Sequence, residues 1–148
     1  MDNLFIDFAF DHPAPDQING VRPPQPKETW PAGEHLEFFL DGALADQAQY
    51  YFFVFNAFGL KWDGIGTESD WNGDWSLQTE IHATGWTAHL IIPMNTIGVN
   101  VTQRSKLNGT FYKQTNYGEE KNRVREHSSW GGAGLHSAAG FGQFVLEW

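Results

Sequence analysis

The stretch from Ser76 to Pro93 reads SLQTEIHATGWTAHLIIP and decides the fold class. It contains two strand-like runs joined by Ala83-Thr84-Gly85, which is short enough to be a turn between antiparallel strands. Side chains of a strand point alternately to its two faces. In the second run this alternation produces one apolar face, made of Trp86, Ala88, Leu90 and Ile92. The stretch therefore predicts an antiparallel hairpin that covers a core with one of its faces.

Similar runs lie on both sides of this hairpin. We expect strands at Leu4–Phe10, His35–Leu40, Tyr50–Asn56, Leu60–Ile65, Leu107–Thr115 and Gly142–Trp148. Residues 11–33 contain six of the seven prolines and predict a loop, whereas residues 93–99 predict a single helical turn. Short strands between turns rich in Gly, Pro, Asn and Asp favour an all-β fold with little helix. We predict one domain over residues 1–148, an antiparallel β-sandwich of the jelly-roll or immunoglobulin-like kind.

The composition excludes several classes of protein. Nine Lys and Arg residues against 18 Asp and Glu residues give a net charge of −9, which makes nucleic acid and anionic membranes poor partners and favours neutral or cationic ligands. No apolar run approaches the roughly 20 residues of a membrane-spanning helix. The absence of cysteine excludes disulfides, a cysteine nucleophile and thiolate zinc sites. Aromatic residues reach 16% and include seven Trp, so we expect some rings at the surface, in contact with a ligand.

Several segments carry a resemblance to a known family. In chain order they are NLFIDFAFDHP, TWPAGEHLEFFLDG, YYFFVFNAFG, DWNGDW followed by GWTAHLIIPM, LNGTFYKQTN, and SSWGGAGLHSAAGFGQFVLEW. Together, their order and spacing make the chain resemble the family 9 carbohydrate-binding modules of bacterial polysaccharide-degrading proteins. The resemblance covers essentially the whole chain. It begins inside the family's pattern, so we expect the N-terminal strand or strands of the family to be lacking.

The resemblance implies a noncatalytic β-sandwich that binds a polysaccharide or an oligosaccharide. It implies that no cofactor is required and that any bound calcium is structural. It also implies an extracellular or periplasmic setting, in which the module is attached to or associated with a glycoside-degrading enzyme. In the family, two aromatic side chains clamp a sugar while polar groups of one sheet bind its hydroxyls.

The family's binding residues can be carried over to individual positions of this chain. Trp30 matches the first clamping aromatic residue, and Glu37 matches a strand glutamate that meets sugar hydroxyls. Asn56 matches a strand-end asparagine, and the second clamping residue falls near His136. From the residues themselves we add Trp130, because the glycines that follow it let a sugar approach the backbone. The predicted ligand-binding residues are Trp30, Glu37, Asn56, Tyr112, Trp130 and His136, and no catalytic residue is predicted.

The residues alone leave simpler interpretations open. Trp30, in the loop PKETWPAG, can pack that loop, and Glu37 can lie on a solvated face. Asn56 can cap the turn that follows its strand. Two acidic groups can supply oxygen ligands to calcium or form solvated loops; they are Glu68 with Asp70 and Asp74, and Asp41 with Asp46.

Two other functions compete with glycan binding. A glycoside-cleaving enzyme needs two carboxyl groups about 5–5.5 Å or about 6.5–9.5 Å apart. Glu37 and Asp41 share a strand face but lie about 13 Å apart at about 3.3 Å per residue, which fits neither geometry. A haem-binding sandwich needs axial ligands, for which Met94 and His89 are the candidates.

Overall fold

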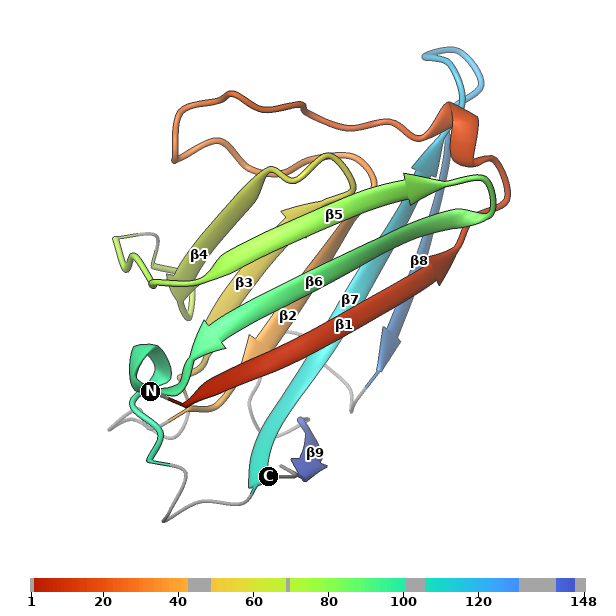
Figure 1. Cartoon of the computed structure of the whole chain (residues 1–148). Coiled ribbons are helices and arrows are strands. Elements are labelled where there is room, and N and C mark those ends of the chain that lie inside the picture. Colours follow the sequence, from red (N-terminus) through yellow and green to blue (C-terminus); the bar gives the residue numbers. More distant parts are fainter. Residues whose placement is uncertain (1, 43–48, 69, 101–105, 131–140, 146–148) are drawn as a thin grey trace.

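The computed structural model describes residues 2–42, 49–68, 70–100, 106–130 and 141–145, and it shows two antiparallel sheets packed face to face (Figure 1). The smaller sheet has the order β1-β6-β5 and the larger has the order β4-β3-β2-β7-β8, with β9 also paired to β7. The strands are β1 (Asn3–Asp11), β2 (His35–Leu40), β3 (Tyr51–Asn56), β4 (Lys61–Ile65), β5 (Ser76–His82), β6 (Gly85–Pro93), β7 (Lys106–Tyr117), β8 (Val124–Trp130) and β9 (Gly142–Val145). The predicted all-β antiparallel sandwich is confirmed.

Helix is confined to two short 3₁₀ turns in the described part of the chain, η1 (Pro15–Gln17) and η2 (Met94–Ile97). η2 lies within residues 93–99, for which the sequence predicts a single helical turn, and it buries Met94 and Ile97, whereas η1 buries no residue. Across the described residues, no helix is both long and apolar enough to cross a membrane.

The predicted strands are observed with small shifts at their ends, except that residues 146–148 of the predicted strand Gly142–Trp148 lie outside the described residues. One observed strand, β8, was not predicted. In the central hairpin His82 pairs with Gly85, so the turn contains only Ala83 and Thr84. β8 reads VREHSSW and is exposed along most of its length. An edge strand that is exposed on both faces shows no apolar alternation, which explains why the sequence pattern missed it.

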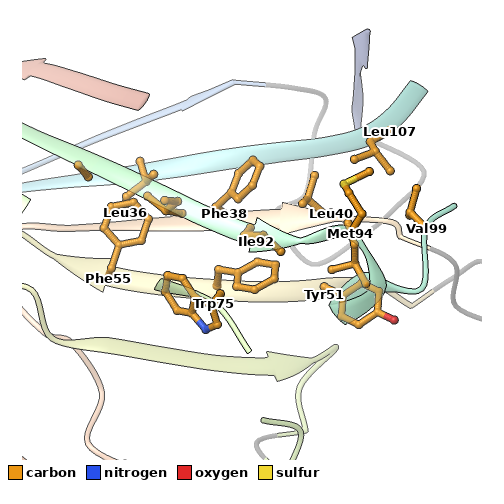
Figure 2. Close-up of a cluster of buried hydrophobic side chains, with 14 of the residues drawn as sticks. Leu36, Phe38, Leu40, Tyr51, Phe55, Trp75, Ile92, Met94, Val99 and Leu107 are labelled. Atoms are coloured by element: carbon orange, nitrogen blue, oxygen red, sulfur yellow. The ribbon is translucent and has the colours of Figure 1, made fainter. Parts of the chain in front are cut away.

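The main core lies between the two sheets (Figure 2). Each sheet contributes alternate residues of its strands, as period-two alternation requires. From the smaller sheet these are Trp86, Ala88, Leu90 and Ile92, the face predicted from the sequence, and from the larger sheet they are Leu36, Phe38, Leu40, Tyr51, Phe53 and Phe55. Trp75 joins this core in Figure 2 and donates its indole N–H to Asp63 Oδ2 over 2.6 Å. The buried indole therefore keeps a hydrogen-bond partner, as a buried tryptophan needs.

The larger sheet also buries part of its outer face. Phe39, Tyr50, Phe52 and Val54 form a second buried cluster there, against which Trp62 and Phe141 pack. All six residues of β3 are buried, which matches the prediction that this aromatic strand is covered on both faces. We call this buried cluster of Phe39, Tyr50, Phe52 and Val54 the aromatic floor of the outer face.

A buried carboxylate closes one end of the sandwich. Glu34 is fully buried and accepts hydrogen bonds from Trp86 Nε1 at 2.8 Å and from the Asn116 backbone N–H at 2.6 Å. It also pairs with the Lys113 ammonium, and His12 Nε2 lies 3.3 Å from its second oxygen. Burial lowers the pKa of Lys113, and the bond and charge of Glu34 oppose that shift. The cluster thus joins β6, β7 and the segments that follow β1 and precede β2.

The long connection between β1 and β2 crosses this end of the sandwich (Figure 1). Its two arms meet at a narrow neck, where Gly20 bridges Gly33 and the Glu34 N–H donates to Asn19 O over 2.7 Å. Gly33 has φ +104°, and a Cβ there would lie 2.3 Å from Asn19 O. The neck therefore requires glycine at position 33, for both backbone conformation and space.

β1 is one edge of the smaller sheet and β5 is the other, and among the described residues each pairs only with β6. An apolar groove of about 430 Å³ lies between β1 and the β7–β9 pair, and Phe5 beside it is 61% exposed. The expectation that the family's N-terminal strands are lacking stays a prediction.

The buried ion pair leads to a stability prediction. Lys113→Met leaves the Glu34 carboxylate buried without its charge partner, so the free energy of unfolding should fall by about 3–5 kcal/mol. Urea denaturation measures this change. Lys121→Met, at an exposed position of the same charge, is the matched control and should change stability by less than about 0.5 kcal/mol.

A second variant separates lost charge from lost packing. Adding Glu34→Gln to Lys113→Met removes the uncompensated charge and should recover part of the lost stability. A Lys113→Met protein as stable as the Lys121→Met control would contradict the role assigned to this pair.

Candidate functional site

The outer face of the larger sheet carries rows of side chains defined by strand register. Residues paired directly across antiparallel strands share a face. Val54 pairs with Trp62 and Glu37, Glu37 pairs with Tyr112, and Tyr112 pairs with Ser129. One row thus runs across all five strands, from an indole at β4, past a carboxylate and a phenol, to a hydroxyl at β8.

A neighbouring row is mainly polar. His35 pairs with Gln114, and Gln114 pairs with His127. Because these residues lie two positions from the first row on their strands, they face the same side. Together the two rows form a polar strip beside the aromatic floor.

Trp30 covers one side of this strip. Its ring lies 5.3 Å from that of Trp62, 5.9 Å from that of Phe52 and 6.2 Å from that of His35, measured between centroids. The side chain stays 37% exposed. Trp30 therefore does pack its loop, as the simpler interpretation held, and still presents part of an indole to solvent above the sheet.

His35 and Glu37 form a hydrogen-bonded pair. His35 Nδ1 lies 2.8 Å from Gly33 O, and Nε2 lies 3.2 Å from Glu37 Oε1. A carbonyl oxygen only accepts, so we assign the Nδ1 proton to that contact. The second contact then needs another proton, carried by Nε2 or by the carboxyl group. The pair fixes the Glu37 carboxyl beside Tyr112 at the centre of the face.

Tyr112 lies over the strip with its ring stacked on that of His127, at 5.3 Å and 22°. Its hydroxyl forms a hydrogen bond with His127 Nδ1. Burial raises the pKa of Tyr112, and the negative charge of Glu37 raises it further. The phenol is therefore held in its neutral form, in which its hydroxyl can both donate and accept.

Asn56 is corrected from a ligand contact to an anchor of the site. It is fully buried, its Oδ1 accepts from the backbone N–H groups of Phe58 and Leu60, and its Nδ2 donates to Val21 O over 2.6 Å. The turn-capping interpretation is therefore the one that the geometry supports. Through Val21 the side chain also holds the crossing loop that carries Trp30.

Trp130 lies on the opposite face of the sheet from Tyr112, and its role as a ligand-binding residue stays a prediction. It pairs with Phe111, the inward neighbour of Tyr112, and its ring stacks on Phe111 at 5.7 Å. The centroid of its ring also lies 5.0 Å from that of Phe144, and a Cβ on Gly142 would lie 2.5 Å from the ring. Since Tyr112 and Trp130 point to different faces, they cannot contact the same sugar across this sheet.

The second clamping position and part of the calcium hypothesis fall outside the described residues. His136 and Asp46 both lie there. Asp41 uses its two carboxylate oxygens to accept from the N–H and Nδ2 of Asn108. Within the described ranges, no group of three or more His, Asp or Glu residues is arranged to hold a metal ion. Structural calcium stays a prediction.

A pocket of about 470 Å³ opens between the crossing loop and the β7–β8 end of this face. Trp30 and His35 form one side, and Gln114, Asn116 and Arg125 lie on the strands. Trp30 and His35 line this pocket, His35 belongs to the polar strip, and Trp30 contacts Phe52 of the aromatic floor. The strip and the pocket therefore form one candidate binding face beside the floor.

Sequence reasoning missed several residues of this face. Period-two spacing from Glu37 points to His35, and the same spacing in RVREH places Arg123, Arg125 and His127 on one side of a strand. Trp62 lies in the predicted strand Leu60–Ile65 and packs, half-buried, against Trp30 and Phe52. These signals were present, but their use required knowing which face of each strand was exposed.

Comparison with known proteins finds no matching family model, curated protein or solved structure.

The electrostatics of the face can be tested on its tyrosines. Burial raises the pKa of Tyr50 and of Tyr112 and the Glu37 charge raises both further, whereas burial alone raises that of Tyr51. Glu37→Gln should therefore lower the pKa of Tyr50 and Tyr112 and leave Tyr51 as an internal control. Alkaline titration followed by NMR of carbon-labelled tyrosine rings measures all three. Equal shifts at Tyr51 and Tyr112 would show that the effect is not the charge of Glu37.

Proposed function

We propose that this protein binds glycans without cleaving them, through the outer face of its larger sheet. The observation that carries the proposal is the half-exposed indole of Trp30 set over Trp62 and Phe52, directly beside a strip of hydrogen-bonding side chains. A sugar ring has an apolar C–H face and a rim of hydroxyls. A binding face for it therefore needs both kinds of surface side by side.

The strip offers groups that suit sugar hydroxyls. Glu37 accepts, and Tyr112 donates and accepts. Gln114 Nε2 donates to Gly33 O over 3.0 Å, and its side-chain oxygen is an acceptor. Because His35 fixes Glu37 and the strands fix Tyr112 and Gln114, these groups are ordered before a ligand arrives. Preorganisation of this kind lowers the entropic cost of binding.

One feature argues against each of the two competing functions, glycoside cleavage and haem binding. Glu37 is the sole carboxylate on the outer face of β2, β3, β4, β7 and β8 among the described residues, so this face lacks the carboxyl pair that glycoside cleavage needs. The haem alternative loses its ligand pair, since Met94 is buried in the core while His89 faces outward and pairs with Asp7 over 2.5 Å.

In line with the resemblance to family 9 modules, we propose that the module acts outside the cytoplasm in association with a glycoside-degrading enzyme.

Replacement of Trp30 tests the proposal. A shallow face with one aromatic wall should bind with about −4 to −8 kcal/mol, or millimolar to micromolar affinity. A glycan array selects the oligosaccharide, and calorimetry measures its affinity. Trp30→Ala should weaken binding at least about tenfold, a loss of about 1.4 kcal/mol, because it removes the stacking surface. The melting temperature should change little, since the side chain is partly exposed.

The control is Trp130→Ala, which removes an equally large and similarly exposed indole from the opposite face. It should bind the selected oligosaccharide as the parent protein does. Loss of binding in Trp130→Ala but not in Trp30→Ala would contradict the site. Chromatography of the oligosaccharide after prolonged incubation should find no shortened products; products that disappear with Glu37→Gln would contradict the noncatalytic role.

A further inference from the structure

The pocket at the end of the binding face has a charge opposite to that of the whole chain. The chain carries 18 acidic and nine basic residues, yet the lining of this pocket includes Arg123 and Arg125 and no carboxylate. Glu126 lies between Arg125 and His127 in sequence, but it pairs with Thr115, whereas Arg125 pairs with Asn116. Strand alternation therefore turns Glu126 to the other face, away from the pocket.

The two guanidinium groups are available to a ligand. Both arginines are exposed, and neither forms an ion pair with any other residue in the described part of the chain. A guanidinium presents several N–H donors in a planar fork that matches the two oxygens of a carboxylate. Two such groups in one pocket, on Arg125 of β8 and on Arg123 just before this strand, thus define a site for an anionic group.

Asn116 supplies a second, independent feature of the same pocket. The residue is 3% exposed and lines the pocket, and its Oδ1 is buried without a hydrogen-bond partner. A buried acceptor without a partner is costly, so a donor such as a ligand hydroxyl would be stabilising there. A ligand that carries both a carboxylate and hydroxyls satisfies the arginines and Asn116 together.

Trp30 connects this pocket to the sugar-binding face, because it lines the pocket and also contacts Trp62. We propose that the sugar recognised at this end is a uronic acid, whose carboxylate pairs with Arg123 and Arg125 while its ring lies against Trp30. The proposal rests on the proposed glycan-binding function and names its substrate class. The net charge of the chain favours a neutral or cationic ligand, and this proposal departs from it. The charges of the residues that contact the ligand, and not the net charge of the whole chain, determine which ligand binds.

Calorimetry with matched acidic and neutral probes tests the proposal. The probes are galacturonate oligosaccharides, the same oligosaccharides after methyl esterification, glucuronate-substituted xylo-oligosaccharides and unsubstituted xylo-oligosaccharides. At least one acidic probe should bind tenfold or more tightly than its uncharged counterpart. The double variant Arg123→Gln/Arg125→Gln should lose at least tenfold in affinity for that acidic probe and bind the uncharged counterpart as before.

Arg22→Gln is the matched control, because Arg22 lies over the Phe58 ring at 3.8 Å and does not line the pocket. It should leave the affinity for every probe unchanged. Equal affinity for acidic and uncharged probes, with no effect of the double variant, would overturn the uronate proposal while glycan binding still stands. Tighter binding of sulfated oligosaccharides than of any uronate would overturn the carboxylate assignment. Failure of all probes to bind, in the parent protein and in Trp30→Ala alike, would count against both proposals.

Discussion

The buried carboxylate of Glu34 is the constraint on which the rest of the structure depends. A buried charge is tolerated only when it is paired and hydrogen-bonded. Glu34 obtains one donor from β6, on Trp86, and two from β7, on Lys113 and Asn116. These donors exist together only when the two sheets are stacked in one relative position. The next residue along the chain is His35, the first residue of β2 and the partner of Glu37, so the same carboxylate sets the start of the strand on which the binding face is built.

The outer face of the larger sheet is exposed in one part and buried in another because its strands differ in what covers them. β2 and β3 have the core on one side and the cluster of Phe39, Phe52 and Val54 on the other. Further along the same strands the crossing loop, anchored by Asn56 and closed at Gly33, passes over the sheet. This part of the sheet is therefore apolar on both faces. Polar side chains reach the surface only where neither the aromatic floor nor the crossing loop occupies the outer face. That combination places stacking and hydrogen-bonding surfaces side by side.

The sequence was sufficient for the fold because apolar alternation reports burial directly. Leu4–Phe10, His35–Leu40 and the central hairpin all appear where the pattern predicts them. The site was only partly predictable. Period two separates Tyr112 from Phe111, but it does not say that Trp130 pairs with Phe111 and thus faces the other way. Register across strands is a property of the folded sheet. Asn56 shows the same limit, since its partner Val21 lies 35 positions away in the sequence.

The contrast between net charge and local charge follows from distance. At physiological ionic strength the Debye length is about 8 Å, so exposed carboxylates on the smaller sheet, such as Asp7 and Glu80, act weakly across the thickness of the sandwich. A guanidinium in contact with a ligand is not screened in this way. An acidic protein can therefore attract an anionic group at one pocket, provided that strand alternation directs its carboxylates elsewhere. In β8 Glu126 directly follows Arg125, and the alternation of the strand determines that Arg125, not Glu126, faces the pocket.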